Sequence, residues 1–206
     1  WKTCDMTEKD ATRDERPWAL VSGASGGLGQ AFSRHLASCG ANLVLTGRRQ
    51  DVLDDLATKL TTRYGIRTIV RPCDIASASE RLTLVEDIAG RGIIIDTLVN
   101  NAGFGAAGRI AETDPVRQTS QVEVNCEAVV HLCGLLLPGM IAAKQGSIIN
   151  VASTAAFQPI PQFATYAASK SFVLSFTKAL WAETNGTGVR VTAVCPGPTE
   201  TGFFDV

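Results

Sequence analysis

A tyrosine and a lysine stand four residues apart at positions 166 and 170, in the stretch YAASK, with only small residues between them. If the stretch is helical, both side chains lie on one face, with about 5–6 Å between their Cβ atoms. A free phenol has a pKa near about 10, and a neighbouring cation favours the phenolate. The pair therefore suggests a proton donor whose pKa is lowered toward neutrality, although the same spacing also arises by chance in a packed core.

A second motif, SGASGGLG at 22–29, carries three glycines in the pattern G-x-x-x-G-x-G. Between a strand and a helix, glycines at these positions let the backbone approach a pyrophosphate closely. The free N–H groups at the start of the helix then point toward its negative charge. A plain flexible turn is the alternative. A nucleoside-triphosphate-binding P-loop is a poor match, because no Gly-Lys-Ser/Thr closes the stretch. The pattern predicts a dinucleotide site at Gly23, Ser25, Gly27, Leu28 and Gly29.

The stretch LTGRR at 45–49 favours NADP(H) over NAD(H) as the cofactor. A site for NAD usually has an acidic residue about 20 positions beyond the glycines, at the ribose 2′-hydroxyl. Here that position is Gly47, followed by Arg48 and Arg49, and a guanidinium can pair with a 2′-phosphate through its planar fork. A solvated basic loop is the alternative, and Asp51 nearby keeps NAD(H) open.

Short apolar runs alternate with longer helical stretches and would position these motifs. The predicted strands are 18–22, 42–46, 67–70, 93–99, 146–152 and 188–194. The predicted helices run from the glycine loop to about residue 39, and then over 51–64, 79–90, 114–137 and 164–184. The alternation predicts a single α/β domain with a doubly wound parallel β-sheet, a Rossmann-type three-layer α/β/α sandwich.

Composition limits the kinds of partner. The 206 residues are 45% hydrophobic and 19% charged, with a net charge of −1, which suits one globular core and offers no basic surface to a nucleic acid. The longest apolar run, 128–143, is too short for a membrane span and contains Pro138. We therefore expect no membrane span, but a buried helix that ends near the proline.

The cysteines and the N-terminal segment bear on the cellular compartment of the protein, and the histidines bear on metal binding. Six scattered cysteines without a C-x-x-C pair predict buried thiols in a reducing compartment. The charged segment 1–17 lacks the apolar core of a secretory signal, so we interpret it as an extension of a catalytic domain over 18–206 and expect a cytoplasmic protein. With only His35 and His131, we expect no metal site.

From residue 18 to 206, the ordered motifs resemble the short-chain dehydrogenase/reductase family. SGASGGLG is similar to its cofactor loop, with Ser22 where Thr is usual, and YAASK fits Tyr-x-x-x-Lys. The family's other motifs are matched by PCDIA at 72–76, NNAG at 100–103, VEVNCEA at 122–128 and PGPTET at 196–201. NNAGFG and VTAVCPGPTETGFF look most like the branch that contains NADPH-linked ketoacyl and hydroxysteroid reductases.

This resemblance implies a catalytic set of Asn125, Ser153, Tyr166 and Lys170. Ser153 precedes Tyr166 by the family's usual thirteen residues and would hydrogen-bond the developing oxyanion. Tyr166 would act as the acid or base. Lys170 would hold the nicotinamide ribose, and Asn125 would anchor a water that leads protons from solvent to Lys170.

The resemblance also implies further cofactor contacts. Asp74 would hold the adenine, NNAG would support the sheet beside the cofactor, and the loop after the sixth strand would bind the nicotinamide carboxamide. Besides the glycine loop, the two arginines, Tyr166 and Lys170, the predicted cofactor residues are Asp74, Ile75, Asn101, Ala102, Gly103, Pro196, Gly197, Thr199 and Thr201.

The activity expected from this resemblance is NADP(H)-dependent hydride transfer between the nicotinamide and a carbonyl or secondary alcohol. Residues expected to border the small-molecule substrate are mostly apolar and favour an apolar ketone, aldehyde or acyl group, unless they are core residues: Phe104, Thr154, Ala155, Phe157, Ile160 and Phe163. The family normally continues beyond the position of Val206 with a substrate loop, a helix and a last strand, and we expect this chain to lack them.

Two other functions are weighed against this one. A non-catalytic NADP(H)-binding sensor on the same fold would be expected to have a broken Ser–Tyr–Lys set, which is intact here. A sugar-nucleotide epimerase usually carries G-x-x-G-x-x-G, which residues 23–29 do not match. The long helices at 114–137 and 164–184 carry more apolar surface than one sheet face requires, so we also expect a homodimer or homotetramer.

Overall fold

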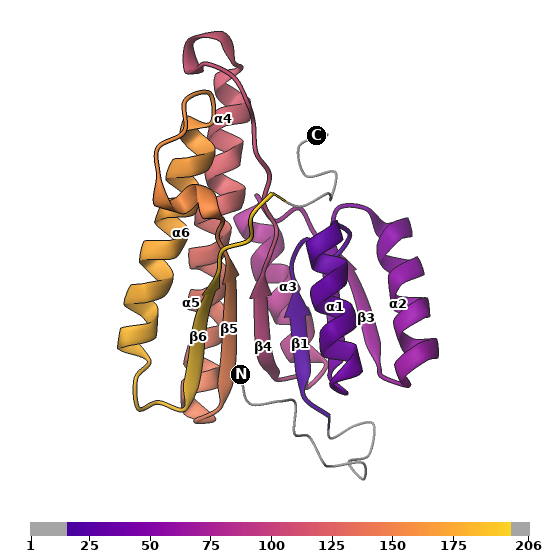
Figure 1. Cartoon of the computed structure of the whole chain (residues 1–206). Coiled ribbons are helices and arrows are strands. Elements are labelled where there is room, and N and C mark those ends of the chain that lie inside the picture. The colour runs from indigo at the N-terminus through magenta and orange to yellow at the C-terminus, as the bar shows by residue number, and fades with distance from the viewer. Residues whose placement is uncertain (1–15, 199–206) are drawn as a thin grey trace.

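A computed structural model describes residues 16–198 of the chain, which Figure 1 draws in colour. Two predicted cofactor residues, Thr199 and Thr201, lie outside the described residues, as does most of the proposed N-terminal extension. The remaining predicted site residues can all be located in the fold.

The strands form one parallel sheet in the order β3-β2-β1-β4-β5-β6. They are β1 (Trp18–Val21), β2 (Asn42–Gly47), β3 (Thr68–Pro72), β4 (Ile95–Asn100), β5 (Gly146–Val151) and β6 (Val189–Val194). Each predicted strand is confirmed within two residues of its expected ends. The order reverses direction between β1 and β4, and at such a switch point the carboxyl ends of the strands leave a crevice for a ligand.

Helices cover both faces of the sheet (Figure 1). Residues of α1 (Gly27–Ser38) and α2 (Gln50–Tyr64) share one buried cluster with the sheet. Residues of α3 (Ala78–Gly90), α5 (Ala128–Ala142) and α6 (Ala164–Glu183) share another. The predicted doubly wound, three-layer α/β/α fold is therefore confirmed.

Local sequence explains where these helices begin and end. In α2, Leu53, Leu56 and Leu60 recur at helical spacing and are buried, and the helix stops where Gly65 takes a left-handed conformation with φ 64°. In α3, the side chain of Ser77 accepts a hydrogen bond from the Glu80 N–H and caps the first turn.

The helix that follows β4 differs from its prediction in two ways. It runs as α4 (Pro115–Val122), a π-helical turn η2 (Glu123–Glu127) and then α5. Pro138 lies inside α5, so the expectation that the helix ends near this proline is wrong. Continuation to Ala142 carries Met140 into the core, and this burial outweighs the backbone hydrogen bond that a proline removes.

By length and composition alone, residues Pro115–Ala142 could cross a membrane, with a mean hydropathy of 1.6 in their most apolar window. This is weak evidence, because a core helix of a soluble protein passes the same test. Residues of α5, such as Leu132 and Cys133, are buried in the same cluster as the sheet. The absence of a membrane span stays a prediction.

Candidate active site

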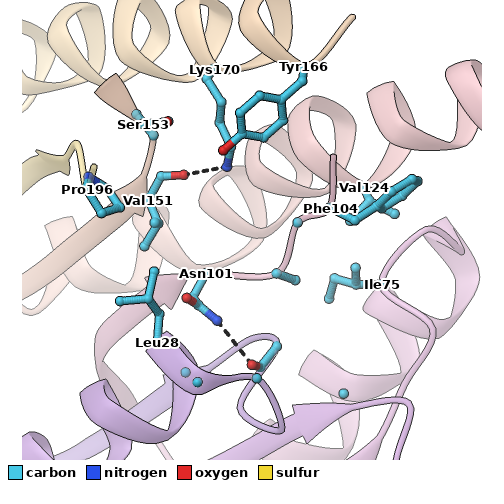
Figure 2. A pocket seen from close by; sticks show the side chains of 18 of the residues that line it. Leu28, Ile75, Asn101, Phe104, Val124, Val151, Ser153, Tyr166, Lys170 and Pro196 are labelled. Carbon is cyan, nitrogen blue, oxygen red and sulfur yellow. Dashed lines mark hydrogen bonds between the residues drawn. The ribbon is translucent and has the colours of Figure 1, made fainter. Parts of the chain in front are cut away.

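A pocket of about 900 Å³ opens at the carboxyl ends of the strands (Figure 2). The glycine loop and the ends of β2 and β3 line one part of it, and the end of β5 and the start of α6 line another. The predicted residues that line it are Gly23, Ser25, Gly27, Leu28, Gly29, Arg48, Arg49, Asp74, Ile75, Asn101, Ala102, Gly103, Ser153, Tyr166, Lys170, Pro196 and Gly197.

The glycine loop is a tight cradle. Gly23 has φ 62°, a left-handed conformation, and a Cβ at Gly29 would lie 2.2 Å from the carbonyl oxygen of Gly23. The side-chain amide of Asn101 donates to the carbonyls of Ser22 and Gly23, at 3.0 and 3.1 Å, and Figure 2 draws one of these bonds. The glycines therefore allow a close approach of backbone segments that larger residues would prevent.

The start of α1 and the end of β2 bring hydrogen-bond donors and two arginines to this part of the pocket. No side chain caps α1 at Gly26, and its first turn has no acidic residue, so its N–H groups are available to an anion. Arg48 and Arg49 line the same pocket, and Arg49 also donates to the Ser25 carbonyl at 2.8 Å. A glycine cradle, a helix N-terminus and two guanidinium groups fit a phosphorylated dinucleotide.

Tyr166 and Lys170 lie one turn apart on α6, and Figure 2 shows both reaching into the pocket opposite Ser153. The Lys170 Nζ donates to the Val151 carbonyl at 2.8 Å and lies 5.9 Å from the centre of the Tyr166 ring. Ser153 follows β5, accepts a hydrogen bond from the Ala155 N–H at 3.1 Å and makes a side-chain hydrogen bond with Tyr166. Spacing and topology thus bring Ser153, Tyr166 and Lys170 together. Asn125 lies near Lys170, because a Cβ at Gly103 would be 3.0 Å from the Asn125 Oδ1 and 3.4 Å from the Lys170 Nζ.

The pKa shifts in this set differ from the expectation. Burial lowers the pKa of Lys170 to about 8 because it penalises the ammonium. Burial also raises the pKa of Tyr166 above its usual value, and the hydrogen bond with Ser153 lowers it only in part. The expected lowering of the tyrosine pKa by Lys170 is therefore wrong for this structure, in which desolvation of the phenol dominates.

Asn125 lies behind the pocket wall, in the π-helical turn η2. Its side-chain oxygen accepts from the Phe104 N–H at 3.1 Å, and its amide donates to the Phe104 carbonyl and the Ser169 hydroxyl, both at 3.0 Å. These bonds tie the segment after β4 to α6. A water held by Asn125 stays a prediction.

Comparison with known proteins agrees with this geometry. Residues 17–205 match the family model described as short chain dehydrogenase. The chain belongs to the short-chain dehydrogenase family. It is 37% identical over 186 residues to sulfoacetaldehyde reductase 2 of Chromohalobacter salexigens, covering 89% of this chain and 73% of that protein. It is 37% identical over 185 residues to a very-long-chain 3-oxoacyl-CoA reductase of Phaeosphaeria nodorum, covering 86% of this chain and 53% of that one.

Solved structures of other short-chain dehydrogenases have the same fold. An actinorhodin polyketide ketoreductase solved with NADPH is 37% identical, with a TM-score of 0.86 over 93% of this chain and 73% of that chain. A short-chain dehydrogenase from Sphingobium yanoikuyae in complex with NADPH is 28% identical, with a TM-score of 0.86 over 91% of this chain and 73% of that chain.

Ser22 marks a departure from the usual short-chain dehydrogenase loop, and its contacts show that serine suffices. Its hydroxyl accepts from the N–H groups of Asn101 and Ala102, each at 3.0 Å, and donates to the Val99 carbonyl at 3.3 Å. These bonds join the glycine loop to the end of β4. A threonine would offer the same hydroxyl, so the substitution keeps the chemistry of the position.

Most of the residues expected to border the substrate line the pocket. Phe104, Thr154, Ala155, Ile160 and Phe163 line the pocket. Phe157, expected among them, does not line it and is 66% exposed, whereas the neighbouring Gln158 does. Phe157 ends the short 3-10 helix η3 (Thr154–Phe157). The turn of this helix decides which of its side chains face the pocket, and the position of Phe157 in the sequence does not reveal that.

Several lining residues were not among the predicted site residues: Gly26, Thr46, Gly47, Cys73, Val124, Val151, Ala152, Gln158 and Pro198. Most of them flank a predicted residue or stand at the end of a strand. Carboxyl ends of parallel strands converge on one edge of the sheet, so this position was the signal that could have found them. Val124 flanks the predicted Asn125 but reaches the pocket from the π-helical turn η2 and not from a strand end.

Proposed function

We propose that this short-chain dehydrogenase is an NADP(H)-dependent oxidoreductase acting on a carbonyl or secondary alcohol of an apolar small molecule. The observation that carries the proposal is one pocket that joins the glycine cradle and two arginines to Ser153, Tyr166 and Lys170. We also propose that residues 18–206 belong to the catalytic domain.

The side chains support a division of roles. Because the pKa of Tyr166 is raised, its phenol keeps its proton at neutral pH and can donate it to a carbonyl oxygen. Ser153 hydrogen-bonds Tyr166 and can hold the same oxygen. Lys170, fixed by the Val151 carbonyl, places positive charge below the phenol and can bind a ribose hydroxyl. NADPH, when bound, supplies the hydride.

The preference for NADP(H) rests on Arg48 and Arg49. Both line the pocket next to the glycine loop, where their guanidinium groups can pair with a 2′-phosphate. Asp51 lies in the first turn of α2 and does not appear among the residues that line the pocket within 16–198. Structures of related enzymes with NADPH support the same cofactor.

The preference for an apolar substrate rests on the pocket wall around Tyr166. Phe104, Ile160 and Phe163 contribute apolar side chains. Within residues 16–198, the cationic side chains that line the pocket are Arg48, Arg49 and Lys170, and none comes from the segment 154–163. A substrate with an anionic group would find no positive partner in the segment 154–163.

The test is oxidation of NADPH and of NADH by the natural protein that contains this chain, against apolar ketones, aldehydes and 3-ketoacyl thioesters. We expect turnover with NADPH on an apolar carbonyl, with Tyr166→Phe as the inactive control. Tight NADPH binding without turnover of any carbonyl would favour the sensor, which the intact Ser–Tyr–Lys set disfavours. Failure to bind either cofactor would refute the proposal.

A further inference from the structure

Arg81 on α3 is a charged residue buried in the core beside the pocket. Its side chain is 0% exposed, which is unusual for arginine, because a buried guanidinium is costly unless its donors are satisfied. Its Nε donates to His131 Nδ1 at 2.9 Å, and one terminal nitrogen, Nη2, donates to the Glu127 carboxylate. Its other terminal nitrogen, Nη1, donates to the carbonyls of Ile75 and Ala76, at 2.5 and 3.0 Å.

The two carbonyls belong to a wall of the cofactor pocket. Asp74 and Ile75 line that wall, in the irregular segment between β3, which ends at Pro72, and α3, which begins at Ala78. A segment without sheet or helix bonds needs other partners for its backbone. Arg81 supplies two of them, and the Asp74 side chain accepts from the Ala76 N–H at 3.1 Å.

The other two partners of Arg81 belong to the neighbouring segment of the chain that runs from η2 into α5. Glu127 is the last residue of the π-helical turn η2 and His131 lies one turn later in α5. The same η2 turn carries Val124, which lines the pocket. Figure 2 shows Ile75 and Val124 as side chains of this pocket, and Val124 packs against the buried cluster that includes Ile75. One guanidinium thus links the backbone of Ile75 and Ala76 to the side chains of Glu127 and His131 on the neighbouring segment.

We propose that Arg81 is a positioning residue for cofactor binding, which sets the wall formed by Asp74 and Ile75 at a fixed distance from the η2 turn. The inference rests on the proposed function, because it assigns this wall to NADP(H). Arginine suits the role, since its planar fork spans two carbonyls, a carboxylate and an imidazole, whereas a lysine is a single point donor. The residue acts through Ile75 and Ala76 and does not itself line the pocket.

The test compares Arg81→Met with Arg91→Met in the natural protein that contains this chain. Arg91 follows the same helix and pairs with Asp87 at 2.8 Å on the surface, so its loss controls for a general effect on α3. We expect Arg81→Met to raise the dissociation constant and the KM for NADPH about ten-fold or more, since two carbonyls lose their donor. We expect kcat at saturating NADPH to change less than about three-fold.

Arg81→Lys is expected to fall between Arg81→Met and the wild type, and it takes the place of Arg81→Met if that variant does not fold. Folded variants that bind NADPH as the wild type does would overturn the inference, as would a loss of kcat at unchanged affinity. An equal loss of affinity in Arg91→Met would also overturn it. A wild-type protein that does not bind NADPH would instead refute the proposed function, and with it this inference.

Discussion

Tyr166 and Lys170 show that burial can change a pKa more than a nearby charge does. Both side chains are shielded from water by the fold, which disfavours their charged forms: the pKa of Tyr166 is raised, and the pKa of Lys170 is lowered to about 8, so the ammonium of Lys170 still predominates at neutral pH. A protonated phenol suits carbonyl reduction at neutral pH. Alcohol oxidation needs the phenolate and is therefore favoured at higher pH.

The first prediction concerns the proton donor. Tyr166→Phe keeps the ring and its packing against Phe163 but removes the hydroxyl. We expect carbonyl reduction to fall by about 10²–10⁴-fold, the usual contribution of general acid catalysis. NADPH affinity should change little, because the glycine cradle is untouched. Steady-state rates and a fluorescence titration of NADPH measure both, and a variant that retains wild-type turnover would exclude Tyr166 as the acid.

The second prediction concerns the pH profile of alcohol oxidation. The side-chain hydrogen bond with Ser153 lowers the pKa of Tyr166, so Ser153→Ala should raise that pKa further. Because oxidation uses the phenolate, its rate rises with pH through the phenol pKa, and the rising limb should move to higher pH in the variant. The measurement is kcat/KM for oxidation against pH. A limb that stays in place or moves to lower pH contradicts the assignment.

At the scale of elements, the turn from β1 into α1 depends on two backbone segments touching. Gly29 lies in the first turn of α1 directly against the Gly23 carbonyl, so a side chain at residue 29 would push the turn and the start of the helix apart. Gly26, three residues earlier, has more room: a Cβ there would lie 3.5 Å from the same oxygen. The two glycines of the motif therefore differ in how well they would tolerate a side chain.

The third prediction uses this difference. Gly29→Ala should lower the stability of the protein without cofactor by about 1–3 kcal/mol, because the added methyl forces the turn apart. Gly26→Ala should change stability little, since a contact of 3.5 Å is ordinary. Denaturant unfolding of both variants and the wild type is the measurement. Equal stabilities of Gly29→Ala and Gly26→Ala would show that the turn relaxes freely.

At the scale of the whole molecule, the outer surfaces of α4, α5 and α6 expose large apolar side chains. Val116 and Val130 lie on the first two helices, and Phe172 and Trp181 lie on α6, where Trp181 is 64% exposed. Monomeric proteins seldom leave large apolar patches in water, and patches of this kind commonly mark interfaces. We propose that these helices pair between copies of the chain.

The fourth prediction tests this pairing. Light scattering of a protein that contains these helices should give two or four times the chain mass, which is 21.8 kDa for these 206 residues. Trp181→Glu should shift the distribution toward monomer, because a charge would be buried in the interface. NADPH binding, whose pocket is not lined by Trp181, serves as the control for folding. A monomeric wild type would rule out the pairing.

Sequence determined much of this protein, since apolar runs and turn residues are local signals. The strands follow from runs such as NLVLT at 42–46, and the cradle follows from the spacing of Gly23, Gly27 and Gly29. Tyr166 and Lys170 share a helix face because four residues make about one turn. These features are determined by residues that are close to one another in the sequence.

Tertiary structure decided what depends on burial and on distant contacts. It set the direction of the Tyr166 pKa shift, carried α5 past Pro138 to bury Met140, and turned Phe157 out and Gln158 in. It also placed Arg81 between segments that lie up to 50 residues away in the sequence. Desolvation and packing depend on which segments meet in space, and neither spacing nor composition specifies that.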